Sequence, residues 1–149
     1  MEPILIDTNL LVYAFDRRDR TRQESAIKIL RLLVKSGLGR ISAQCLGEFF
    51  NATIKGREPI LSISEAAEQT EKLAHALAVY PVTQQVVLEA IRGVQQHKLP
   101  YWDAQIWSAA RLNQIPTIFS EDFSDGMMLE GVRFVNPLKP DFQLQDWIH

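Results

Sequence analysis

Four acidic residues, far apart in the sequence, are the side chains best suited to chemistry: Asp7, Glu48, Asp103 and Asp122. Asp7 and Asp122 each follow a short apolar run with the character of a buried strand. Glu48 and Asp103 fall in segments with helical spacing. The carboxyl ends of strands in an open α/β sheet meet at one edge, where ligands bind, so all four acids are expected to converge there.

A cluster of like charges of this kind either raises a pKa or binds a hard metal ion. Oxygen ligands alone select Mg²⁺ or Mn²⁺ over Zn²⁺, and His75, His97 and His149 are too scattered to add an imidazole set. Two such metals about 4 Å apart can activate a water and stabilise both oxygens of a phosphodiester undergoing displacement. Metal-dependent phosphodiester hydrolysis is therefore the leading hypothesis, with the choice between RNA and other phosphate esters left open.

Each acid also has an ordinary structural interpretation. Asp7 or Asn9 can cap the helical turn that follows, since both residue types are good N-caps. Glu48 can be a solvent-facing helix former. Asp103 lies in the first turn of its helix, where the helix dipole favours a carboxylate. The repetition of an acid at two strand ends, Asp7 and Asp122, favours the functional interpretation.

Strands that alternate with helices predict an α/β fold with a mostly parallel central sheet of about five strands and helices on both faces. The expected strands are residues 4–6, 40–42, 79–82, 115–119 and 132–135. The expected helices are residues 21–36, 43–55, 62–77, 83–96 and 101–112. Ser62 and Glu65 have the spacing of a capping box, and residues 10–15 form a turn or short helix.

Several neighbouring residues are expected to support the acids. Thr8, Asn9 and Ser120 extend the polar clusters at the two strand ends, and Asn51 lies one helical turn after Glu48, on the same face. A mixed-sign segment holds three arginines near the expected site: Arg17, Arg18 and Arg20. These could contact phosphates, although a run of this kind is more often a solvated loop or helix start.

A chain of 149 residues with 46% hydrophobic content predicts one domain spanning residues 1–149, with an extended tail from about residue 137. The single cysteine, Cys45, is expected to be a core thiol. The sequence predicts no signal peptide and no membrane span, so a cytoplasmic location is expected. With a net charge of −2, nucleic-acid binding would have to come from local basic patches or bound cations.

The ordered set of motifs resembles the PIN-domain family, and within it the VapC-type toxins of toxin-antitoxin pairs. The matching pieces cover nearly the whole chain: Ile6-Asp7-Thr8-Asn9-Leu10-Leu11, Glu48 with Phe49 and Asn51, Leu99-Pro100-Tyr101-Trp102-Asp103-Ala104, and Ser120-Glu121-Asp122-Phe123. The resemblance implies a Mg²⁺- or Mn²⁺-dependent endoribonuclease that cuts RNA, with the four acids as metal ligands. It also implies a homodimer and an antitoxin partner that occludes the site.

The sequence departs from the family pattern at two places. Pro100 stands where many relatives have a serine helix cap, and Glu121 and Asp125 flank the fourth acid. Asp122 best matches the family position, and Asp125 is kept as a candidate fifth metal ligand.

Two rival functions remain open. A phosphatase could use Asp7 as a nucleophile, but such enzymes typically want a second aspartate two positions later, where this chain has Asn9. A non-catalytic PIN-like module could bind RNA or protein. A degenerate site of that kind usually loses acids, and all four are present here.

Overall fold

The central sheet orders the whole molecule. The computed structural model describes residues 1–148, and its six strands run in the order β3-β2-β1-β4-β6-β5. Their bounds are β1 Ile4–Ile6, β2 Gly39–Ser42, β3 Ala78–Tyr80, β4 Thr117–Phe119, β5 Met128–Leu129 and β6 Val132–Val135. All neighbouring strands are parallel except β5, which is antiparallel to β6. The prediction of an α/β fold with a mostly parallel sheet is confirmed.

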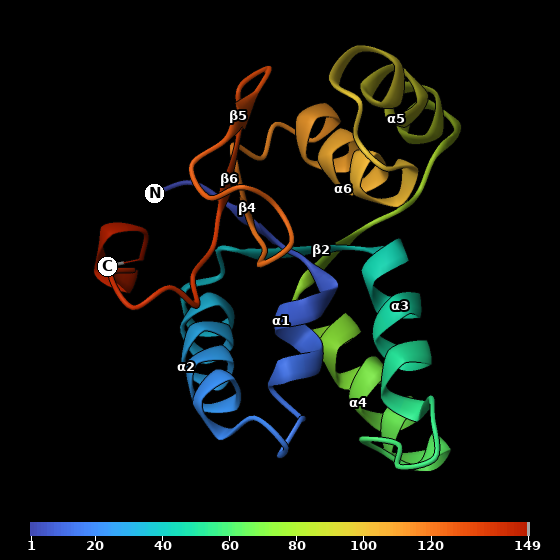
Figure 1. Cartoon of the computed structure of the whole chain (residues 1–149), viewed down its shortest axis with the longest axis vertical. Helices are drawn as coiled ribbons and strands as arrows, with labels where there is room; N and C mark the ends of the chain where they lie inside the picture. The colour runs from blue at the N-terminus through green and yellow to red at the C-terminus, as the bar shows by residue number, and fades with distance from the viewer. Residues whose placement is uncertain (149) are drawn as a thin grey trace.

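Six helices pack around this sheet. They are α1 Thr8–Tyr13, α2 Arg20–Ser36, α3 Ala43–Ile54, α4 Ile63–Ala76, α5 Gln84–His97 and α6 Tyr101–Leu112. In Figure 1, α1 to α4 lie below β2, and the α5–α6 pair lies above it. Helices therefore cover both faces, as a sheet of buried parallel strands requires. No helix within residues 1–148 is both long enough and apolar enough to cross a membrane.

Strand β1 is the centre of the core. Its three residues are 0–2% exposed, and it pairs with β2 on one side and with β4 on the other. Trp107 of α6 and Phe49 of α3 are the largest side chains buried beside the sheet. Cys45 is a fully buried thiol, as predicted, and burial raises its pKa to about 12.

The α5–α6 pair packs at very close range. A Cβ placed on Gly93 of α5 would lie 2.8 Å from Cζ3 of Trp107, so only glycine lets the two helices meet without moving the indole. The indole also donates a hydrogen bond of 3.1 Å from Nε1 to the carbonyl of Leu129 in β5. This contact ties the helix pair to the edge of the sheet.

The predicted elements agree with the structure to within a few residues. The capping box is formed: Ser62 Oγ accepts from the Glu65 N–H at 3.1 Å, and Glu65 Oε1 accepts from the Ser62 N–H at 3.0 Å. The expected strand 79–82 is displaced and ends at Tyr80, before Pro81, which has no N–H to donate. Residues 10–15, expected as a turn or short helix, belong mostly to α1.

The sixth strand, β5, was not predicted. It is two residues long and joins β6 through Glu130 and Gly131, whose φ angles are 49° and 84°. Two consecutive positive φ angles with glycine second are typical of a tight hairpin turn. The dipeptide was therefore the available signal.

The C-terminal tail lies over the sheet but is not extended throughout. It contains a short 3-10 helix, Leu144–Asp146, and buries Leu144 and Ile148. The rings of Phe142 and Trp147 meet the ring of Phe119 edge-on, with centroids 5.5 and 5.9 Å away. The last residue of the expected tail, His149, lies outside the described part of the chain.

Candidate active site

Asp7 is the buried centre of the candidate site. It follows β1 directly, caps α1, and is only 3% exposed. Its Oδ1 accepts a hydrogen bond of 2.7 Å from the Thr8 N–H, and its Oδ2 accepts one of 2.6 Å from the Ser120 hydroxyl. The helix-cap interpretation is therefore correct for Asp7, and it leaves the carboxylate held in one orientation.

The surroundings of Asp7 make its charge costly. Burial raises the pKa of this carboxyl to about 6, against the hydrogen bonds from Ser120 and Thr8, which lower it. The charges of Asp122 and Glu48 raise the pKa further. A strongly shifted carboxyl that is coupled to other acids is typical of a functional site.

Glu48 reaches the same site from α3. Its Oε1 accepts hydrogen bonds from the Thr8 hydroxyl at 3.1 Å and from Gln44 Nε2 at 3.0 Å. Thr8 therefore joins the two acids, since its backbone N–H binds Asp7 while its side chain binds Glu48. This contact spans 40 residues of sequence, from α1 to α3.

Asp103 and Asp122 complete the set. Asp103 lies in the first turn of α6 and Asp122 lies just after β4. Burial raises the pKa of Asp103, and the charges of Asp122 and Glu48 raise it further. Within residues 1–148 neither side-chain carboxylate accepts a hydrogen bond. The four predicted acids are thus electrostatically coupled, with two of them free to meet a ligand.

Ser120 and Asn9 link the two strand ends. The Ser120 hydroxyl donates to Asp7 and accepts from the Asp122 N–H at 3.1 Å and from Asn9 Nδ2 at 3.4 Å. The Oδ1 atom of Asn9 is buried and has no hydrogen-bond partner within residues 1–148. An acceptor of this kind needs a donor, a water or a cation.

The two acids that flank Asp122 are engaged elsewhere. Glu121 Oε1 accepts from the Tyr13 hydroxyl at 2.6 Å, and its Oε2 pairs with Arg22 Nε at 2.9 Å. Asp125 accepts from the Asn136 N–H at 2.8 Å and lies 3.4 Å from Lys139 Nζ. Both side chains are thus occupied by contacts outside the coupled set.

Asn51 lies on α3 after Glu48 and is exposed, and none of its side-chain contacts joins it to the acids within the described chain. The supporting role expected for Asn51 therefore has no contact in the structure to carry it out.

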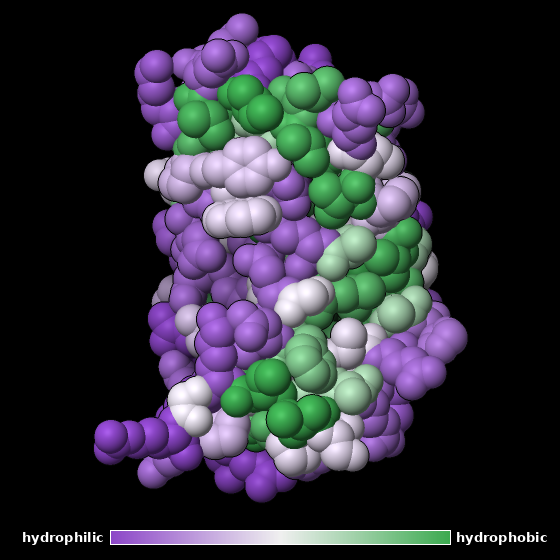
Figure 2. Space-filling model, turned by 90° about the vertical axis from the view of Figure 1, so that its right-hand side faces the viewer, coloured by the Kyte–Doolittle hydropathy of each residue, from purple (hydrophilic) through white to green (hydrophobic). Residues whose placement is uncertain are grey.

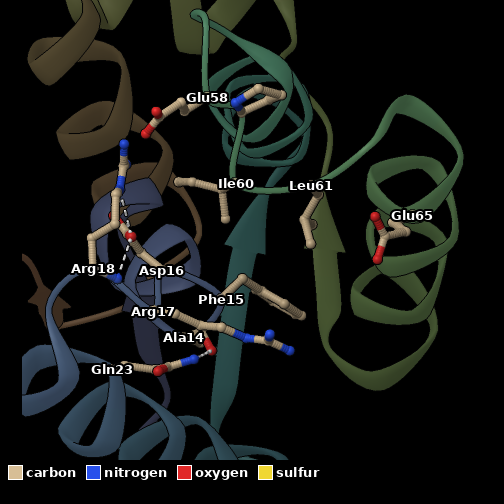
Figure 3. A pocket seen from close by; sticks show the side chains of 11 residues that line it. Ala14, Phe15, Asp16, Arg17, Arg18, Gln23, Glu58, Ile60, Leu61 and Glu65 are labelled. Carbon is tan, nitrogen blue, oxygen red and sulfur yellow. Dashed lines mark hydrogen bonds and ion pairs between the residues drawn. The ribbon is translucent and has the colours of Figure 1, made fainter.

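The three predicted arginines do not gather beside the acids. Arg18 binds Asp16 with both ends of its guanidinium, at 2.8 and 3.0 Å, and Arg20 is an exposed residue at the start of α2. Figure 3 shows Arg17 and Arg18 lining a separate pocket of about 500 Å³ with Glu58 opposite. This pocket lies beyond the end of α1, away from Asp7 at its start (Figure 1).

The donor set fits a hard divalent cation. All its ligand atoms are carboxylate or amide oxygens, the donors that Mg²⁺ prefers. Within residues 1–148, no three acid, histidine or cysteine side chains are grouped so that together they could hold a metal ion. Mg²⁺ keeps several waters and commonly takes only one or two carboxylates, so an open arrangement around a fixed Asp7 is compatible with it. The buried Oδ1 of Asn9, which has no hydrogen-bond partner within residues 1–148, is a further oxygen donor of the kind that such a cation accepts.

Two residues of the site were not predicted. Gln44 binds Glu48, and Gln105 of α6 in turn donates from Nε2 to Gln44 Oε1 at 2.7 Å. Gln44 lies four residues before Glu48, one helical turn away, and this spacing was the signal available in the sequence. Gln105 has no such local signal, because its contact joins two helices 61 residues apart.

Several solved structures with this fold are toxins or toxin-antitoxin complexes. A toxin-antitoxin complex from Klebsiella pneumoniae matches with a TM-score of 0.66 and 21% identity, covering 90% of this chain and 97% of that one. The VapC20 toxin of Mycobacterium tuberculosis, described as cleaving the sarcin-ricin loop, matches with a TM-score of 0.64 and 18% identity, covering 80% and 89%. DNA-bound VapBC from Salmonella typhimurium gives 0.62 and 18%, covering 90% and 97%.

At these low identities, the structural similarity shows a shared fold and nothing more. No curated protein matches the sequence. The PIN-domain family model matches residues 4–124, which include all four coupled acids. The resemblance drawn from the sequence motifs is thereby confirmed: this chain belongs to the PIN-domain family.

Proposed function

We propose that this chain is a Mg²⁺- or Mn²⁺-dependent endoribonuclease that hydrolyses RNA phosphodiester bonds, and that it is the toxin of a toxin-antitoxin pair. The observation that carries the proposal is that the charges of Glu48 and Asp122 act on both Asp7, which is buried and held by Thr8 and Ser120, and Asp103. A fully degenerate, non-catalytic module would have no reason to keep a charge whose burial is this costly.

The chain's own residues have separable roles in this chemistry. Asp7 is fixed by Thr8 and Ser120, and Glu48 is fixed by Thr8 and Gln44, so these two carboxylates form the rigid half of the site. Asp103 and Asp122, whose carboxylates accept no hydrogen bond within residues 1–148, form the half that is open to a ligand. When bound, the divalent cation supplies Lewis acidity and a water of lowered pKa.

The cation also answers the charge problem. The chain has a net charge of −2, and the arginines near residue 17 lie away from the acids. A divalent cation held by the acids converts the site into one that attracts phosphate. We therefore do not assign Arg17, Arg18 or Arg20 to substrate binding at the cleavage point.

Cleavage of RNA by the purified chain is the direct test. We expect cleavage with Mg²⁺ or Mn²⁺, none with EDTA, and loss of at least a hundredfold in Asp7→Asn and Asp103→Asn. Asp125→Asn is the matched control, because its carboxylate binds Asn136 and Lys139, and we expect it to keep full activity.

The possible results separate the rival functions. RNA binding without cleavage at any metal concentration would favour the non-catalytic module. A phosphorylated Asp7 trapped during hydrolysis of a phosphate monoester would favour the phosphatase. If Asp7→Asn or Asp103→Asn cut RNA as fast as the parent, the site assignment would be refuted.

We further propose a homodimer that uses the apolar face of α5. Leu88 and Ile91 lie one turn apart on this helix and are 57% and 43% exposed, and nearby Val82 is 38% exposed. Figure 2 shows apolar side chains gathered at the end of the molecule where α5 lies. Exposed apolar residues in one place mark an interaction surface. Leu88→Glu should convert a dimer to a monomer in light scattering, and an unchanged mass would refute this assignment.

The proposal of an antitoxin partner rests on the structures that share this fold. Structural neighbours include toxin-antitoxin complexes. We propose that the partner occludes the acids. Coexpression with the product of the adjacent gene should abolish RNA cleavage, while a partner that binds without inhibiting would refute occlusion.

A further inference from the structure

Trp102 is an exposed aromatic residue at the start of α6, a helix whose middle is buried. Its exposed fraction is 63%, whereas all seven residues from Ala104 to Ala110 are buried. Of the other tryptophans, Trp107 is fully buried and Trp147 packs on Phe119. The exposed indole offers an apolar, aromatic face to a ligand at the start of this helix.

The backbone of Trp102 is tied to the acidic site. The residue precedes Asp103 in the first turn of α6, and its carbonyl accepts a hydrogen bond of 3.2 Å from Gln44 Nε2. The same nitrogen donates to Glu48 Oε1 at 3.0 Å. One amide group therefore positions both Trp102 and Glu48.

The ring of Trp102 has a fixed neighbour on one side. The Tyr101 ring meets it edge-on, with centroids 5.0 Å apart and an interplanar angle of 80°. The Tyr101 hydroxyl donates to Gln105 Oε1 at 2.7 Å, and Gln105, which is 5% exposed, donates in turn to Gln44 at 2.7 Å. A chain of hydrogen bonds thus runs from the Tyr101 hydroxyl through Gln105 and Gln44 to Glu48, and the Tyr101 ring packs against the indole.

We propose that Trp102 is a stacking platform for an unpaired RNA base next to the cleaved phosphodiester. This inference rests on the function proposed above and adds a residue that contacts the substrate. Both faces of a base inside a duplex are covered by its neighbours, so only an unpaired base can lie on the indole.

The place of Trp102 directly before Asp103, in the first turn of α6, favours a base of the substrate as the occupant. The acids repel the phosphate backbone, and within the described chain the arginines of residues 17 and 18 line a different pocket. Stacking on an aromatic ring depends on no net charge and tolerates every base. It is therefore the contact by which an acidic site can hold RNA while a bound cation meets the phosphate.

Steady-state cleavage of a single-stranded RNA with Mn²⁺ tests the proposal. We expect Trp102→Ala to raise KM about tenfold to a hundredfold with kcat nearly unchanged, the range implied by the loss of one stacked base. Trp102→Phe should restore most of the affinity because it keeps an aromatic face. Leu112→Ala is the matched control, since Leu112 is 41% exposed at the other end of the same helix.

Binding provides a second readout that needs no catalysis. In the Asp7→Asn background, RNA should quench tryptophan fluorescence, because Trp102 is the most exposed of the three indoles, and Trp102→Phe should remove most of the quenching. If the parent and the Trp102 variants had nearly equal KM values and nearly equal quenching, the stacking role would be overturned. Cleavage of RNA by those same proteins would still support the proposed function. A Trp102→Ala variant that changed the oligomeric mass and left KM unchanged would assign the residue to a protein interface and also overturn it.

Discussion

Replacing Asp7 with asparagine should stabilise the metal-free protein at neutral pH, although it removes the central acid. The folded-state pKa of Asp7 is about 6, against an ordinary value of 3.8. The folded state therefore binds a proton more tightly than the unfolded state, and stability falls as the pH rises from about 4 through about 6. Since each pKa unit corresponds to about 1.36 kcal/mol, the charged carboxylate costs about 3 kcal/mol above that range.

The substitution also carries a cost. The Ser120 hydroxyl already accepts hydrogen bonds from Asn9 and from the Asp122 N–H, so an asparagine amide facing it would meet a group whose acceptor sites are filled. A lost hydrogen bond of this kind costs about 1 kcal/mol. The net expectation is that Asp7→Asn is more stable than the parent by about 2 kcal/mol at about pH 7.5 and less stable by about 1 kcal/mol at about pH 4.

Urea unfolding in EDTA, at several pH values, measures this difference. A gain of 2 kcal/mol corresponds to a rise in the midpoint of about 1 M urea for a domain of this size. Asp16→Asn is the control of opposite sign, because the hydrogen bond from Arg18 lowers the pKa of Asp16. That variant should be less stable than the parent at neutral pH, and the gap should close as the pH falls through the aspartate range. A difference between Asp7→Asn and the parent that did not vary with pH would refute the reasoning.

Three further predictions test the metal, the strand-end link and the packing. Mn²⁺ at a hundred times its Kd should stabilise the parent by about 2.7 kcal/mol and raise Tm by several degrees in calorimetry, with no comparable shift in Asp7→Asn. Ser120→Ala removes a hydrogen bond that lowers the pKa of Asp7, so the acid limb of the pH profile of RNA cleavage should move to higher pH; an unmoved limb would contradict this. Gly93→Ala should cost about 1–3 kcal/mol in chemical denaturation because its Cβ would lie 2.8 Å from Trp107. Gly47→Ala, where nothing lies within 4 Å, should be neutral or stabilising.

Local sequence signals predicted most of the fold because each element begins and ends on side-chain chemistry. Ser42, Ser62 and Thr83 cap three helices as expected. The strand at residues 4–6 was recognisable from three consecutive apolar residues, and they are buried on both faces. Strand β5 escaped because two residues give no periodicity, and only its turn carried information.

The site was harder to predict than the fold because its contacts are not local. The residue types and strand-end positions were enough to select Asp7 and Asp122. They could not show that Tyr13 and Arg22 bind the carboxylate of Glu121. These contacts give Glu121 an environment different from that of Asp122, its neighbour in the sequence. The arginines at residues 17 and 18 were close to Asp7 in sequence, but α1 carries the chain away from the sheet edge before they occur.

The position of β1 between β2 and β4 has a consequence for synthesis of the protein. A ribosome makes Asp7 and Glu48 before β4, and Ser120 follows Asp7 by 113 residues. Until then the first strand lacks one of its two partners, and the Ser120 hydroxyl that orients Asp7 does not exist. A nascent chain that ends before Ser120 therefore lacks the hydroxyl that orients Asp7, and the cleavage proposed above has to wait until β4 and the residues after it have been made.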